Sequence, residues 1–218
     1  VPHTGLRTAR LDGLDGTAFS PDEIYLTLAH FSNDVTQRSS DYTGQQIYYK
    51  SIQTRETDAM TMEQYIWRWD TDWFWCSGAL GAQNPLLRPL LPRRVLRSDV
   101  YWKIVGFERR HGWKSALDLR RGRAPREPVI QDVEVPADRL NEFLEFFADE
   151  IGITPVWLCP LRQRERDATW DLYALDPSTT YVNLGFWSSV EQKAGQQEGH
   201  HNRRIEEAHW GSRDARGL

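Results

Sequence analysis

The sequence has little cysteine, no long apolar run and no excess of positive charge. Its two cysteines, Cys76 and Cys159, are too few for a disulfide framework, so a reducing, cytoplasmic compartment is expected. No stretch approaches the roughly 20 apolar residues of a membrane-spanning helix, so any contact with a membrane is expected from a region outside this sequence. The formal net charge of -4 gives no reason to expect a nucleic acid as partner.

The signature motifs of several common chemistries are also missing. The sequence contains no GxGxxG, P-loop, CxxC or HExxH motif, which removes support for a nucleotide, redox-dithiol or zinc site. The pair His200-His201 lies in a polar region and is expected to be solvated, and Cys159 is expected to be a small buried hydrophobe. No metal site is therefore predicted.

What the sequence does contain is tryptophan, with ten residues among 218, together with eight tyrosines and eight phenylalanines. Large aromatic side chains stabilise by burying broad apolar area, and they often form interfaces and ligand pockets. Their number in one modest domain predicts that some of them belong to a surface that is covered in the working protein.

Hydrophobic periodicity predicts strands and helices along most of the first half. Residues 16–31 are predicted to form a hairpin, with a proline turn at 20–23 and a half-buried second strand. Helices are predicted within 61–75 and 98–108, and residues 109–127 form a basic, exposed connector.

The second half carries the clearest pattern. Residues 129–135 alternate as a strand that leads into Pro136, and apolar residues at helical spacing then predict an amphipathic helix that ends at Gly152. Residues 153–161 are apolar on both faces, as in a central covered strand, and residues 181–187 form a further strand. This order predicts an α+β fold with a mainly antiparallel sheet and helices on one face.

The two ends of the chain differ from the rest. The opening, from Val1, has no strong periodicity, as expected of a chain that begins inside a longer protein. From Glu191 onward almost nothing apolar remains, so residues 191–218 are predicted to be a polar, disordered tail. Residues 1–190 are predicted to form the one domain.

The strand 181–187 suggests a binding surface. Its even positions are plain core: Val182, Leu184 and Phe186. Its odd positions combine hydrogen-bonding groups, a gap and a large ring, as ligand-facing surfaces do: Tyr181, Asn183, Gly185 and Trp187. A solvent-facing strand with incidental aromatics is the alternative.

Gln131 is a second candidate, because it is the one polar residue on the apolar face of its strand. A buried amide needs hydrogen-bond partners. Gln131 is expected to form hydrogen bonds either with a neighbouring stretch of backbone or with a ligand.

Two segments resemble a known family. The run Ile130 to Pro136, an amphipathic helix, and then the run Pro155 to Leu161 are similar to the VQD…VP junction and the P-[IV]-W-L-C-P strand of the Δ24-sterol reductases. The resemblance spans roughly Asp15 to Trp187. Further matching positions are Asp22-Glu23, Arg68, Phe74-Trp75, Asn84-Pro85, Tyr181 and Gly185.

The resemblance implies a domain of a vanillyl-alcohol-oxidase-type flavoprotein. In that superfamily an N-terminal domain of the same protein binds FAD, and a C-terminal cap covers the flavin ring and builds the substrate pocket. This sequence matches the cap alone, so catalysis by the chain on its own is not expected. The residues implied to face substrate or flavin are Gln131, Trp157, Asn183, Gly185 and Trp187.

The implied reaction is the reduction of a C=C bond in a small, lipophilic, sterol-like substrate, with NADPH as the electron donor and FAD as the carrier. An isolated alkene is a poor hydride acceptor, so the cap must supply a positioned acid or an ordered water, and Tyr181 is the candidate. Asn183 stands where the family has an acid, and an amide cannot donate a catalytic proton, which counts against a sterol substrate specifically. The alternatives are an FAD-linked oxidase of an alcohol or sugar, and a catalytically inactive fragment or binding module.

Overall fold

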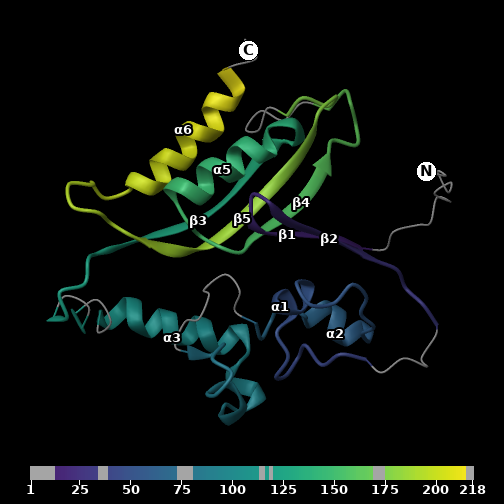
Figure 1. Cartoon of the computed structure of the whole chain (residues 1–218), viewed down its shortest axis with the longest axis vertical. Helices are drawn as coiled ribbons and strands as arrows, with labels where there is room; N and C mark the ends of the chain where they lie inside the picture. Colours follow the sequence, from purple (N-terminus) through teal and green to yellow (C-terminus); the bar gives the residue numbers. More distant parts are fainter. Residues whose placement is uncertain are drawn as a thin grey trace.

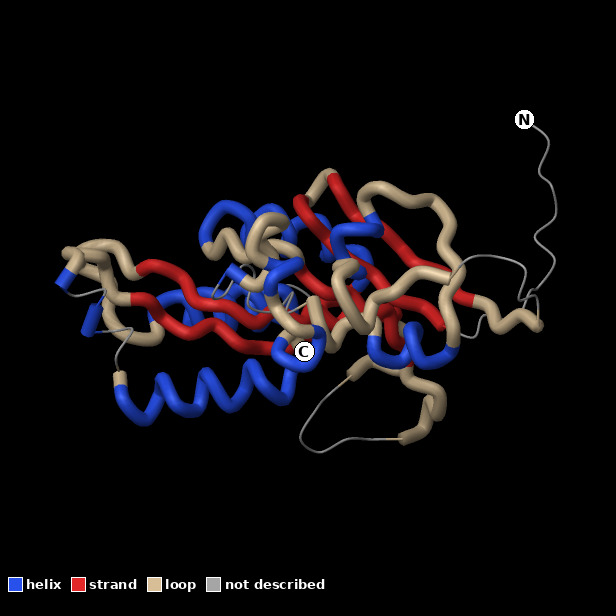
Figure 2. The backbone as a smooth tube through the Cα atoms, turned by 90° about the horizontal axis from the view of Figure 1, so that it is seen from below, coloured by secondary structure: helices blue, strands red, loops and turns tan. Residues whose placement is uncertain are grey.

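A five-stranded antiparallel sheet forms the centre of the structure, in the order β2-β1-β4-β5-β3 (Figure 1). The computed structural model describes residues 13–33, 39–72, 81–112, 116–117, 120–168 and 175–214. The strands are β1 Gly13–Ser20, β2 Glu23–Ala29, β3 Arg126–Pro136, β4 Val156–Arg162 and β5 Thr180–Glu191. Figure 2 shows the strands in red from below, where the long β3 and β5 run side by side. The predicted α+β fold and antiparallel sheet are confirmed.

Helices lie on both sides of the sheet in Figure 1, but only α5 and α6 build its core. The α-helices are α1 Tyr48–Ile52, α2 Met62–Trp67, α3 Ser98–His111, α5 Leu140–Glu150 and α6 His200–Asp214. Short 3-10 turns occur at η3 Arg88–Leu90, η4 Arg93–Val95 and η5 Ala137–Arg139. Among the described helices, none has the length and apolar character needed to cross a membrane.

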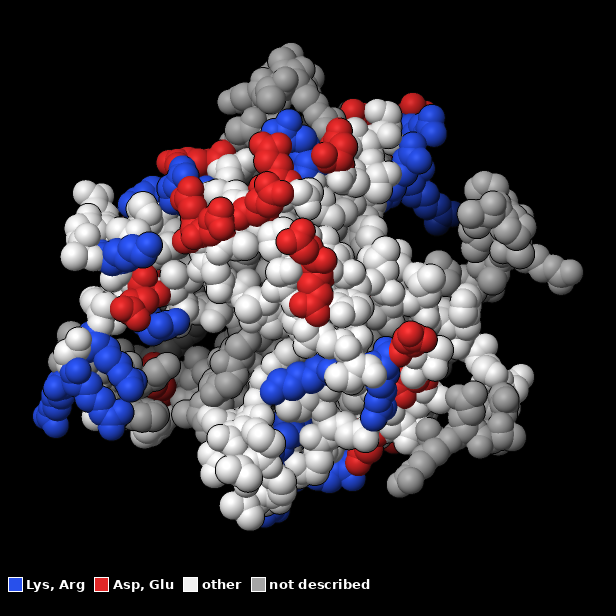
Figure 3. Space-filling model, in the orientation of Figure 1, with Lys and Arg blue, Asp and Glu red and all other residues white. Residues whose placement is uncertain are grey.

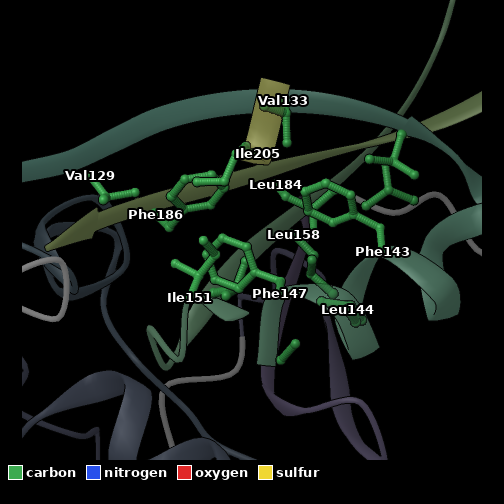
Figure 4. Close-up of a cluster of buried hydrophobic side chains, with 14 residues drawn as sticks. Val129, Val133, Phe143, Leu144, Phe147, Ile151, Leu158, Leu184, Phe186 and Ile205 are labelled. Atoms are coloured by element: carbon green, nitrogen blue, oxygen red, sulfur yellow. The ribbon is translucent and has the colours of Figure 1, made fainter. Parts of the chain in front are cut away.

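The main core lies between the sheet and α5 (Figure 4). Phe147 of α5 packs on Phe186 of β5, with ring centroids 4.5 Å apart and the ring planes tilted by 47°. The other buried members come from β1, β3, β4, β5 and both helices: Ala18, Val129, Val133, Val135, Phe143, Leu144, Ile151, Val156, Leu158, Val182, Leu184 and Ile205. The even positions of β5 therefore point into the core against α5, as predicted.

The hairpin is confirmed, but its second strand is less covered than expected. The apolar residues of β2 do lie on one face of the sheet. It is the same face on which α5 packs against Ala18. Ile24, Leu26 and Leu28 are nevertheless exposed, because β2 is the edge strand furthest from β3 and β5.

The prediction of a disordered tail over 191–218 is wrong for its central part. Residues 200–214 form α6, and Ile205 is fully buried in the core. His201 is also buried, which corrects the expectation that the pair His200-His201 is solvated. The helix has few apolar residues, so its attachment depends on polar contacts at its first turn.

Those contacts come from Glu127 of β3. Its carboxylate oxygens accept hydrogen bonds from the backbone N–H groups of His201 (3.1 Å) and Asn202 (3.0 Å), and from both side chains, at 2.9 and 2.7 Å. A negative charge at a helix N-terminus satisfies free N–H groups and interacts favourably with the helix dipole. Burial alone would raise the pKa of Glu127, but these hydrogen bonds outweigh it and lower the pKa to about 2.

We predict that acid releases α6 through this carboxylate. Because the pKa of Glu127 in the folded protein is about 2, below its usual 4.5, its contribution to stability is complete above pH 4.5 and is lost as the pH falls toward 2. The contribution is on the order of 3 kcal/mol. Urea unfolding measured across this pH range should therefore show a steeper loss of stability for the wild type than for Glu127→Gln.

The matched control is Glu206→Gln, since Glu206 is an exposed carboxylate on the same helix. That variant should retain the slope of the wild type. Equal slopes for wild type and Glu127→Gln would show that this carboxylate does not hold α6.

Candidate functional site

The face of the sheet opposite α5 and α6 carries the predicted ligand-facing surface, and we call it the polar face. Its central row crosses all five strands in register: Asp132 of β3, Gly185 of β5, Trp157 of β4, Thr17 of β1 and Tyr25 of β2. Strand alternation places Asn183 and Trp187 on this face, on either side of Gly185. The structure thus brings together Trp157, Asn183, Gly185 and Trp187, as expected.

Gly185 lies beneath two indole rings. A Cβ atom at this position would lie 2.8 Å from Cη2 of Trp187, 3.1 Å from Cε3 of Trp157 and 2.8 Å from Oδ1 of Asp132. The gap expected at Gly185 is therefore filled by the tryptophans of the same sheet. Only glycine allows the two rings and the carboxylate to converge there.

Trp157 is oriented by a buried carboxylate. Its Nε1 donates a hydrogen bond to Oδ1 of Asp15 on β1. The second oxygen, Oδ2, accepts from Nη2 of Arg68 at 3.0 Å, and both side chains of this ion pair are largely buried. Arg68 follows α2 and packs on the ring of Tyr65, with its guanidinium carbon 4.2 Å from the ring centroid. One carboxylate therefore links β1, β4 and the α2 segment.

Asp132 is the acidic group beside Gly185, and the sequence analysis did not select it. Partial burial raises its pKa above the usual value, although the residue as a whole remains exposed. The signal was present in the sequence, because Asp132 follows Gln131 and therefore lies on the face opposite the core. Its proximity to Gly185 depends on the pairing of β3 with β5, which the sequence does not specify.

The neighbouring row of the polar face, formed by Glu134, Asn183 and Cys159, has no aromatic side chain. Nδ2 of Asn183 donates to Oε1 of Glu134 at 2.8 Å, and Asn183 is the cross-strand neighbour of Cys159. Cys159 is partly buried, and its pKa is raised first by that burial and then by the charge of Asp15. A thiol with a raised pKa is a weak nucleophile at neutral pH. Cys159 was expected to be a small buried hydrophobe, and in the structure it is only partly buried.

Tyr181 lies away from the tryptophans. Four residues of strand separate it from Gly185, which corresponds to about 13 Å. Its hydroxyl oxygen accepts a hydrogen bond from the backbone N–H of Asp176 at 3.0 Å. The structure does not bring Tyr181 to the centre of the site, and its role as a proton donor stays a prediction.

Gln131 does not belong to this surface. It pairs across the sheet with Phe186, a core residue, and its Nε2 donates to Oδ1 of Asn202 on α6 at 2.7 Å. The correction follows from strand alternation, which places Gln131 and Asp132 on opposite faces. Of the two roles considered for this amide, the structure favours the anchoring of a neighbouring element.

The remaining sequence features are distributed as follows. Arg68 has a defined role in the ion pair above, whereas Phe74-Trp75 and Cys76 lie outside the described residues. The described residues contain no cluster of His, Cys, Asp or Glu suited to a metal ion. Within the described structure, two surface hollows lie near Phe19 and near Ser189, and neither is lined by Trp157 or Trp187.

Comparison with known proteins gives one distant link. The chain is 33% identical over 81 residues to the protein described as Delta(24)-sterol reductase homolog dhcr-24 from Caenorhabditis elegans. The match covers 37% of this chain and 15% of that protein. No protein-family profile and no solved structure matches the chain. The chain therefore has a distant relation to a sterol reductase homologue, which points to an oxidoreductase-like protein.

We predict that Gly185→Ala destabilises the protein by about 1–3 kcal/mol, because the added methyl group overpacks the space under the indoles. Two of its contacts would be shorter than 3.0 Å, one to the carboxylate of Asp132 and one to the ring of Trp187, and the ring of Trp157 would lie at 3.1 Å. The free energy of unfolding in urea measures the effect.

Gly106→Ala is the matched control, since Gly106 lies within α3 and a methyl group there meets no atom within 4 Å. That change should be neutral or stabilise by up to about 1 kcal/mol, because alanine favours a helix. A neutral result for Gly185→Ala would contradict the packing described at the site.

Proposed function

We propose that the chain forms the substrate-side domain of a longer FAD-dependent oxidoreductase, which reduces a C=C bond of a sterol-like lipophilic substrate. The observation that carries the proposal is the convergence of Asp132, Trp157 and Trp187 over Gly185. The distant match to a sterol reductase homologue supports the same reaction class. NADPH is the proposed electron donor.

The residues of the polar face suit the ring of a flavin and not its pyrophosphate. Indole rings are flat and apolar, as a surface beside a flavin ring requires. The charged groups near them are the carboxylates Asp15, Asp132 and Glu134, and Arg68 is already paired with Asp15. A pyrophosphate needs N–H donors or cations. We therefore propose that the FAD-binding domain of the same protein, outside this chain, holds the dinucleotide.

Each residue has a distinct proposed role. FAD, when bound, would supply hydride to the substrate. Trp157 and Trp187 would hold the apolar substrate and exclude water. Asp132 would donate the proton to the alkene carbon, in place of Tyr181, because its pKa is already raised and a covering domain would raise it further.

Exposed apolar side chains support a covering partner. Several large apolar residues on α2 and α3 are more than half exposed: Met62, Ile66, Trp67, Trp102 and Phe107. Extended exposed apolar surface is unusual on a monomer and marks interaction sites. This agrees with the expectation that part of the aromatic content serves a surface that is covered in the working protein.

A second candidate function is the oxidation of an alcohol or a sugar by the same cofactor. The observation that favours it is the hydrogen-bonded pair of Asn183 and Glu134 beside Cys159, since a substrate hydroxyl could join such a polar row. Turnover of alcohols by the flavin-loaded protein, without alkene reduction, would select this function.

We predict that Asp132→Asn lowers alkene reduction by about 10²–10⁴-fold in the longer FAD-containing protein, because general acid catalysis contributes a factor of this size. Flavin content and reduction of the flavin by NADPH should be unchanged. Activity of the wild type should fall as the pH rises through the raised pKa of Asp132.

Tyr181→Phe is the control, and it should retain most of the activity because its hydroxyl lies away from the tryptophans. Loss of activity in Tyr181→Phe with normal activity in Asp132→Asn would restore Tyr181 as the donor. If the longer protein binds no flavin at all, the whole proposal fails.

A further inference from the structure

The segment between residues 84 and 97 presents leucines to solvent on a convex tip. Leu86 is 81% exposed, Leu90 76% and Leu87 47%, and the prolines among them are exposed too: Pro85, Pro89 and Pro92. The segment forms the lowest projection in Figure 1. Leu86 and Leu90 are the most exposed of the large apolar side chains in the described structure.

A buried arginine holds the tip in shape. Arg88 lies between the leucines, is 3% exposed and donates to the backbone carbonyls of Gln45 (2.7 Å), Gly44 (2.9 Å) and Thr71 (3.1 Å). A fixed guanidinium that satisfies several loop carbonyls makes the tip rigid. The outward direction of Leu86 and Leu90 is therefore built into the fold.

The charge around the tip is opposite to that of the whole chain. No Asp or Glu occurs between Asp72 and Asp99, although four arginines lie in that stretch: Arg88, Arg93, Arg94 and Arg97. The net charge of the chain is -4. In Figure 3, Asp and Glu gather in the upper part of the view, whereas the lowest projection is mostly uncharged with Lys or Arg beside it.

Three of these arginines, Arg93, Arg94 and Arg97, follow the leucines in the chain and are exposed. Arg93 and Arg97 contact Asp41 (2.7 Å) and Asp99 (3.1 Å), in ion pairs whose side chains are at least half exposed. Such pairs are weak in water. Arg94 has no ion-pair partner among the described residues.

We propose that this tip, from Pro85 to Arg97, docks on an anionic phospholipid surface, with Leu86 and Leu90 at the acyl boundary and the arginines at the phosphates. A projecting apolar tip followed by cations matches the arrangement by which peripheral proteins enter a bilayer interface. The proposal stands on its own, without the flavin function.

The test is cosedimentation of the purified chain with vesicles of phosphatidylcholine alone, or with about one-third phosphatidylserine, at low and high salt. We expect binding to the anionic vesicles at low salt and weaker binding to the neutral ones. Leu86→Gln with Leu90→Gln should reduce the partition coefficient at least about tenfold on both vesicles. Arg94→Gln with Arg97→Gln should reduce it on the anionic vesicles only.

The matched control is Leu26→Gln with Leu28→Gln, which removes similarly exposed leucines (61% and 57%) from the β2 edge. This variant should bind as the wild type does. Thermal unfolding of all three variants checks that the fold is retained. Failure of the wild type to bind anionic vesicles at low salt, or equal binding by Leu86→Gln/Leu90→Gln, would overturn the proposal.

Discussion

The carboxylate of Asp15 is the contact on which the polar face depends. It lies within the sheet, largely removed from water, where an unpaired charge would be costly. Its two oxygens serve two structures: one accepts the indole N–H of Trp157, and the other pairs with Arg68 at 3.0 Å. The same group therefore orients the tryptophan beside Gly185 and attaches the α2 segment to the sheet.

Glu127 has the corresponding role on β3, an edge strand of the sheet. Both carboxylates lie on strands, both are buried, and each binds a helical segment that packs on the sheet. The two sites differ in their partners. Asp15 faces a cation and an indole, whereas Glu127 faces the free N–H groups of α6. On each face of the sheet a buried acid thus binds a helical segment: Glu127 binds α6, and Asp15 binds the α2 segment through Arg68.

The strands and their faces could be predicted because alternation is local. Val182, Leu184 and Phe186 follow the period of a strand, and they do lie in the core. The face on which Gln131 lies could also be predicted, because the apolar sides of β3 and β5 must share one face of the sheet. The error was to group Gln131 with residues of the opposite face. The sequence did not predict that residues 200–214 form a packed helix. The contact that binds this helix comes from Glu127, which is 74 residues away from His201 in the chain.

The centre of the candidate site illustrates the same limit. Alternation alone predicts that Trp187 and Gly185 share a face, but the proximity of Asp132 and Trp157 arises from two registers, β3 with β5 and β4 with β5. A shift of one residue in either register would turn that strand's side chains to the other face. The apolar even positions of β5 prevent such a shift, because it would expose Leu184 and Phe186. The buried face of the sheet thus sets the registers that bring Asp132 and the two tryptophans together on the other face.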